Sequence, residues 1–236
     1  ADRIVDRCDS LKLHGNGRPD SEITVECNPD SISPTALKLL RQEGVNRLSI
    51  GVQATDNSLL KLIGRRHNFQ QAQKAFQDAR NAGFDNISLD LMYGLPSQTK
   101  NDWADTLAKI VEMHPEHLSC YGLKLEEGTP LWQQRQALTL PDDDAQADMY
   151  LYTVAALEEA GYQQYEISNF AKPGRASRHN LKYWNMEEYA GFGPGAHSDF
   201  GGVRYGYVRD LDRYIAGQLV LAESEDGETL ARDYEY

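Results

Sequence analysis

Short apolar runs alternate with longer helical segments over residues 22–125. The runs are rich in β-branched and aliphatic residues, which is typical of buried strands in a parallel sheet. Each helical segment begins at a good capping residue and ends near glycine or proline. We expect strands at Ile23–Glu26, Arg47–Gln53, Asn86–Tyr93 and His117–Leu123.

Four helices are predicted between these strands. In each helix the apolar residues recur at intervals of three and four, so that they share one face. Successive β/α units of this kind predict an α/β fold, built as a barrel or a doubly wound sheet. The expected caps are Ser33 and Asp56, two further helices are expected to begin near Asn68 and Thr99, and the expected ends lie at Gly44, Gly64, Gly83 and Pro115.

The pattern changes after Pro130. Pro141 and the acidic run that follows it predict the start of a long helix that reaches about Ala160. Residues 162–170 alternate like a strand of a different, smaller sheet, and glycine, proline, tyrosine and histidine dominate the loop-rich remainder. We therefore divide the chain into residues 1–135 and a smaller α+β C-terminal region, residues 136–236.

Composition narrows the class of protein. The 236 residues are 40% hydrophobic, enough for a substantial core. A net charge of -12 argues against a nucleic-acid partner, and no apolar run approaches the ~20 residues of a membrane span. Three cysteines without a C-x-x-C pair, and no apolar leader, predict a reducing, cytoplasmic setting.

Polar residues end three of the predicted strands. These are Glu26, Gln53 and Asp90, and Asp90 interrupts an otherwise apolar run. A buried carboxylate is costly unless it is paired, so this position needs a reason. Carboxylate and amide groups suit a hydroxyl-rich ligand such as a ribose, and Arg65 could meet a ligand carboxylate. Alternatively, these groups bond only loop backbone and one another.

Several blocks of the chain resemble the oxygen-independent coproporphyrinogen III oxidase-like family of radical-SAM proteins. The resemblance runs from about residue 20 to 220 and keeps the family's order. It implies a partial (β/α) TIM-like barrel that lacks its opening strands. It also implies that S-adenosylmethionine contacts Glu26, Gln53, Arg65 and Asp90, with Gln53 and Asp90 on the ribose. The blocks are residues 26–29, 46–53, 89–96 and 98–99.

Two C-terminal blocks, residues 179–184 and 191–198, resemble the HemW-type heme-chaperone branch of that family. The branch implies a protein that binds heme and transfers it to a respiratory enzyme. His179 would ligate iron, and Tyr183 and Trp184 would offer flat faces to the porphyrin. Alternatively, His179 and Trp184 form a hydrogen-bonded core pair that holds a loop.

The chain departs from the family at its cluster motif, because no C-x-x-x-C-x-x-C run is present. We therefore expect a 4Fe-4S cluster only in a full-length protein, whether this chain is truncated or naturally cluster-less. No metal ligands are assigned, and we expect no cleavage of S-adenosylmethionine by this chain. The alternative function is that of a coproporphyrinogen III dehydrogenase in porphyrin biosynthesis. A β/α hydrolase or isomerase is disfavoured, because no nucleophile and base pair stands out.

Overall fold

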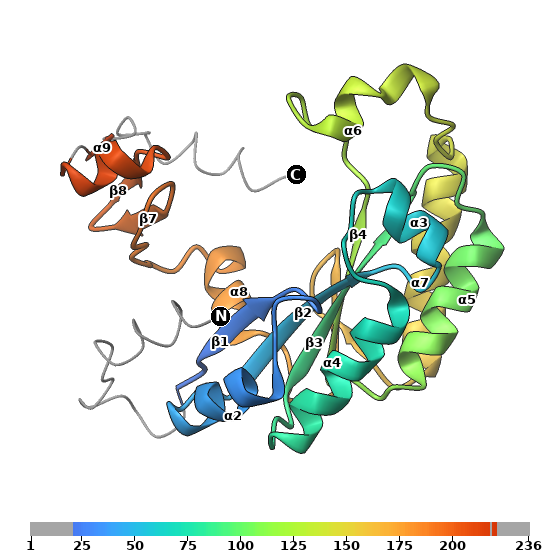
Figure 1. Ribbon diagram of the computed structural model, residues 1–236, viewed down its shortest axis with the longest axis horizontal. Helices are drawn as coiled ribbons and strands as arrows, with labels where there is room; N and C mark the ends of the chain where they lie inside the picture. The colour runs from blue at the N-terminus through green and yellow to red at the C-terminus, as the bar shows by residue number, and fades with distance from the viewer. Residues whose placement is uncertain (1–20, 218, 221–236) are drawn as a thin grey trace. The chain divides into compact units, whose positions relative to one another are not determined.

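The computed structural model describes residues 21–217, 219 and 220. It divides into two compact units, and the boundary falls between residues 176 and 177. The first unit contains the predicted β/α elements together with a short helix and a 3-10 turn that the sequence pattern did not predict (Figure 1). They are β1 (Thr24–Cys27), α2 (Pro34–Gln42), β2 (Arg47–Gln53), α3 (Asn57–Leu62), α4 (Phe69–Asn81), β3 (Ile87–Tyr93), α5 (Lys100–Val111), β4 (His117–Gly122), α6 (Pro130–Gln133), a 3-10 turn (Arg135–Ala137), α7 (Asp143–Glu159), β5 (Gln163–Gln164) and β6 (Asn169–Ala171).

The strands of the first unit form one sheet in the order β1-β2-β3-β4-β6-β5. β1 to β4 are parallel, as predicted, whereas β6 runs antiparallel to β4 and to β5. The prediction that residues 162–170 belong to a different, smaller sheet is therefore wrong. In the described residues the sheet stays open, with β1 and β5 at its edges.

The predicted caps Ser33 and Asp56 and the predicted helix starts at Asn68 and Thr99 are confirmed. The side chains of Ser33 and Asp56 accept hydrogen bonds from backbone N–H groups in the first turns of α2 and α3. Asn68 and Thr99 form reciprocal capping boxes at the starts of α4 and α5. Such caps satisfy N–H groups that have no partner within the helix, each for about 1 kcal/mol. The long predicted helix is α7, capped by Asp142.

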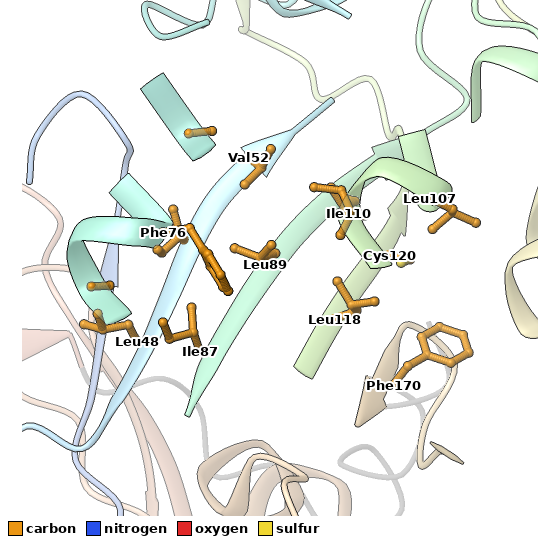
Figure 2. Packing of buried hydrophobic residues seen from close by; sticks show 14 of the residues in the cluster. Leu48, Val52, Phe76, Ile87, Leu89, Leu107, Ile110, Leu118, Cys120 and Phe170 are labelled. Carbon is orange, nitrogen blue, oxygen red and sulfur yellow. The ribbon is translucent and has the colours of Figure 1, made fainter. Parts of the chain in front are cut away.

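Alternate residues of the strands build the core. Leu48, Leu89 and Leu118 come from three neighbouring strands and pack in one cluster with Phe76 of α4 and Ile110 of α5 (Figure 2). Successive side chains of a strand point to opposite faces, so these residues define the face of the sheet that the helices cover. Burying each large side chain contributes roughly 1.5–3 kcal/mol.

The second unit contains a small antiparallel sheet, β7-β8-β9. Among its described residues Val208 is the buried hydrophobic residue, so the unit lacks a core like that of the first. No helix in the described part of the chain is long and apolar enough to cross a membrane. The elements of the second unit are α8 (Arg178–Trp184), β7 (His197–Phe200), β8 (Val203–Tyr207), α9 (Leu211–Ile215) and β9 (Leu219–Val220).

Candidate functional site

The face of the first sheet opposite the core is polar. In the strand register Glu26 lies beside Ser49, Ser49 beside Ser88, and Ser88 beside His117. These positions alternate with the apolar residues that pack under the helices, so they point the other way. We call this surface the polar face. Its members are Glu26, Ser49, Gly51, Ser88, Asp90, His117 and Ser119.

Asp90 lies at the centre of the polar face. The Ser49 hydroxyl donates to both of its carboxylate oxygens, at 3.0 and 3.2 Å. Burial raises the pKa of Asp90 from 3.8 to about 6; the Ser49 hydrogen bond opposes this, the charge of Glu26 adds to it, and Arg47 and Ser119 lower it. At neutral pH Asp90 is therefore mostly ionised and remains an acceptor of hydrogen bonds.

Gln53 ends β2 in an unusual backbone conformation. Its φ is +70°, and the pairing of β2 with β3 shifts register between Gly51 and Gln53. A Cβ added to Gly51 would lie 2.8 Å from the Nε2 atom of Gln53, so the Gln53 amide lies over Gly51. Because Gly51 pairs with Asp90, Gln53 and Asp90 reach the same part of the polar face. Left-handed φ at a residue other than glycine costs energy and is common at functional sites.

Arg65 reaches the same edge from the segment that follows α3. Its Nη1 atom donates to Asn28 Oδ1 at 3.0 Å. Asn28 follows β1, and its Oδ1 atom lies 3.6 Å from where a Cβ of Gly51 would be. The guanidinium group of Arg65 is thus placed at the carboxyl ends of the first two strands, where ligands bind in parallel α/β folds.

The structure therefore brings the four predicted residues to one part of the sheet: Glu26, Gln53 and Arg65 lie near the carboxyl ends of β1 and β2, and Asp90 lies in the middle of β3. In this described region no hydrogen bond joins any two of the four. Asp90 bonds instead to Ser49 and Ser88, and Arg65 bonds to Asn28; none of these partners was predicted as a site residue from the sequence. Ser49 could have been found from strand alternation, because it shares a face with Gly51 inside an apolar run.

The second unit holds the other predicted group, on α8. His179 Nε2 lies 2.8 Å from the hydroxyl oxygen of Tyr183, and the Tyr183 ring meets the Tyr189 ring edge to face, with centroids 4.6 Å apart. Trp184 is 44% exposed, and α8 has no buried residue. A buried pair of His179 and Trp184 is therefore not what the structure shows. These aromatic side chains lie at the surface of their own unit.

Comparison with known proteins decides the family. A family model described as the Radical SAM superfamily matches residues 2–110. Residues 2–110 belong to the radical SAM superfamily. In structure this radical SAM chain is similar to the coproporphyrinogen III oxidase HemN of Escherichia coli, a radical SAM enzyme, with a TM-score of 0.78 and 25% identity over 93% of this chain and 55% of that one. The likeness confirms the predicted α/β fold of a partial radical-SAM barrel.

Curated relatives of this radical SAM protein include heme chaperones. The heme chaperone HemW of Bacillus subtilis is 45% identical over 197 residues, which are 83% of this chain and 52% of the relative. HemW of Escherichia coli is 43% identical over 178 residues, 75% of this chain and 47% of the relative. The radical S-adenosyl methionine domain-containing protein 1, mitochondrial, of Bos taurus is 44% identical over 183 residues, which are 77% of this chain and 41% of the relative. The chain spans about half the length of these relatives.

Membership of the radical SAM superfamily implies S-adenosylmethionine and a 4Fe-4S cluster, and the described residues fit the first better than the second. Carboxylate, amide and guanidinium groups gather in one part of the sheet, as a ribose and an amino acid require. No group of three or more histidine, cysteine or acidic residues in the described ranges could hold a metal ion. Burial raises the pKa of Cys27 to about 12, and Cys120 is 2% exposed, so neither thiol suits a cluster iron.

Proposed function

We propose that this chain is the nucleoside-binding and heme-handling part of a radical-SAM heme chaperone. In this proposal the polar face binds the adenosyl end of S-adenosylmethionine, and α8 contacts heme that is passed on to a respiratory heme protein. The observation that carries it is the gathering of Glu26, Gln53, Arg65 and Asp90 in one part of the sheet. The similarity to curated HemW proteins supports the heme function.

Each group of the proposed adenosyl site has a distinct task. Asp90, held by Ser49, accepts hydrogen bonds from the ribose diol. The Gln53 amide, placed over Gly51, donates to or accepts from the same sugar. Arg65 binds the methionine carboxylate, and Glu26 adds a second acceptor. When bound with a cluster, S-adenosylmethionine supplies the radical chemistry of the superfamily.

The proposed heme contact rests on the chemistry of α8. Imidazole can ligate heme iron, and exposed aromatic rings pack against a porphyrin. His179 and Tyr183 are held together by their hydrogen bond, and Trp184, the last residue of the same helix, is exposed. We propose heme or a related porphyrin as the ligand of this helix.

A second function, oxidative decarboxylation of coproporphyrinogen III, is favoured by the structural similarity to HemN. A product assay with coproporphyrinogen, run on a longer form of this chain that carries a cluster, separates the two functions. The chaperone proposal expects no decarboxylated product. Formation of the product would assign the chain to the dehydrogenase function.

The adenosyl site is tested by titrating the 236-residue chain with S-adenosylmethionine and following the ligand's ribose signals by saturation-transfer NMR. Asp90→Asn should weaken binding about tenfold, because hydrogen bonds to a charged group are the stronger kind. Asp105→Asn makes the same change on the exposed surface of α5, where Asp105 pairs with Lys109, and should leave binding unchanged. Equal affinities in both variants would refute the site.

The heme contact is tested by a heme titration that follows the Soret band. His179→Asn should weaken saturable binding about tenfold, because it removes the proposed iron ligand. His114→Asn is the matched control; His114 is an exposed histidine with a φ of +57°, a conformation that asparagine tolerates. Equal loss in both variants, or binding that neither one affects, would contradict a heme site on α8.

A further inference from the structure

Behind Asp90, the polar face carries buried side chains that the proposed ligand would not touch. Ser88 and His117 are neighbours in the register of β3 and β4, and both are fully buried. Tyr165 approaches them from the segment between β5 and β6. Buried polar groups are costly without partners, so their hydrogen bonds show what they do.

These side chains form one continuous chain of hydrogen bonds that ends on Asp90. The hydroxyl oxygen of Tyr165 lies 2.7 Å from His117 Nε2, and His117 Nδ1 lies 2.8 Å from Ser88 Oγ. Ser88 then donates to Asp90 Oδ1 over a longer 3.4 Å. The chain thus links a residue outside the parallel strands to the carboxylate at the centre of the polar face.

The Ser88 hydroxyl has one proton, so it cannot donate both to His117, at 2.8 Å, and to Asp90, at 3.4 Å. We assign this proton to Asp90, because a carboxylate can only accept; Ser88 then accepts from His117, and the imidazole carries its proton on Nδ1. His117 Nε2 is then an acceptor, so the Tyr165 hydroxyl donates to it. In this arrangement every donor points toward the charge on Asp90, as a carboxylate acceptor requires.

Burial keeps His117 neutral. Its pKa is lowered from 6.5 to about 3, first by burial and then by the positive charge of Arg47 on β2. The other ionisable groups that face it are Tyr165, by its hydrogen bond, and Asp90, through Ser88. Because the imidazole is neutral, it does not place a positive charge beside Asp90. It acts here only through the position of its proton.

We propose that His117 and Tyr165 are positioning residues that hold Ser88, and through it Asp90, in the orientation that accepts a ribose diol. The inference rests on the proposed adenosyl site and adds to it two residues that do not contact the ligand. Ser49 holds Asp90 from the β2 side, and the chain from Tyr165 holds it from the β3 side.

The position of the imidazole proton gives a test that needs no ligand. Long-range ¹H–¹⁵N NMR on the 236-residue chain should show His117 neutral and protonated on Nδ1 between pH 5 and pH 8. Protonation on Nε2 in that range would overturn the proposal, because Ser88 would then donate to His117 and not to Asp90.

Removing the Tyr165 hydroxyl tests the link to Asp90. Tyr165→Phe should raise the pKa of the Asp90 carboxyl, because a donor that favours the charged form is loosened, and should weaken S-adenosylmethionine binding about threefold. Ser88→Ala should likewise raise the pKa of Asp90 and weaken S-adenosylmethionine binding. Tyr150→Phe is the matched control, since the Tyr150 hydroxyl bonds Gln164 and lies outside this chain of bonds; it should change neither quantity.

The two measurements separate this inference from the proposed function. The pKa of Asp90 is followed by carboxyl ¹³C NMR without ligand. If wild type binds no S-adenosylmethionine but Tyr165→Phe raises that pKa, the adenosyl site fails and the positioning role stands. If Tyr165→Phe folds normally by circular dichroism and leaves the pKa of Asp90 and the affinity as in wild type, the positioning role is overturned.

Discussion

Asp90 has a cost to the fold. Its pKa is raised to about 6, above the 3.8 of an exposed aspartate, because burial penalises its charged form more than Ser49 and Arg47 favour it. Between these two values the folded state holds more protons than the unfolded state. The free energy of unfolding therefore falls as pH rises through this window. A group kept at such a cost is typical of a binding site.

Asp90→Asn should remove this fall in the free energy of unfolding with rising pH, because asparagine does not ionise. Relative to wild type, the variant should gain about 1–3 kcal/mol of stability between pH 4 and pH 7, measured by urea unfolding. Asp56→Asn provides the opposite case, because hydrogen bonds from Ser58 lower the pKa of the Asp56 carboxyl. The charged Asp56 carboxylate stabilises the folded wild type at neutral pH. Relative to wild type, Asp56→Asn should therefore become less stable as pH rises. The same pH trend in both variants would contradict the assignment.

At the same scale, the sequence pointed to Glu26, Gln53 and Asp90 as candidates and gave no sign of Ser88 and His117. Glu26, Gln53 and Asp90 could be found because each ends or interrupts an apolar run. His117 and Ser88 could not, because their roles depend on which strands are neighbours and in what register. That information is tertiary and becomes readable only once the strand order is known.

Among the elements, one ion pair joins α4 to the starts of two strands. Arg80 binds both oxygens of Glu116, at 2.8 and 2.9 Å, and also donates to the carbonyl oxygens of Phe84 and His114. Glu116 in turn accepts from the backbone N–H of Ile87, the first residue of β3. Both side chains are mostly buried, at 23% and 15% exposed. The pair therefore fixes where β3 and β4 begin.

Arg80→Met should lower the free energy of unfolding by about 2–3 kcal/mol, because it leaves the Glu116 carboxylate and two carbonyl oxygens without their donor. Lys74→Met is the control on the same helix. Lys74 forms an exposed pair with Asp78, worth under ~0.5 kcal/mol. Urea unfolding at pH 7 measures both variants, and a loss as small for Arg80→Met as for the control would contradict the role of the pair.

The sequence predicted the helices of the first unit well, because their caps are local signals, but it missed the hairpin of the second unit. β7 and β8 are joined by Gly201 and Gly202, whose φ values are +66° and +74°. A Gly-Gly pair between short runs is a hairpin signal, yet the flanking residues alternate weakly. The sheet to which residues 162–170 belong depends on pairing with β4, and no local pattern specifies that choice.

For the whole molecule, the two units differ in how they are stabilised. The first has a continuous core between sheet and helices, whereas the second has little buried apolar area among its described residues. The division of the chain at residue 135 was inferred from a change of pattern, and the units of the structure divide after residue 176. Compactness follows contacts distant in sequence, such as those of β6 with β4, which a change in periodicity does not register.

The alternation of side chains along β2, β3 and β4 has a consequence for how such a protein can diverge. Positions 48, 50, 87, 89 and 118 carry the packing, whereas positions 49, 51, 88, 90 and 119 face the other way. Each strand thus carries two alternating sets of residues, one for packing and one for the polar face, and either set can change while the other is kept. A lineage can exchange its ligand through every second residue and inherit the scaffold intact, and a protein engineer could follow the same spacing.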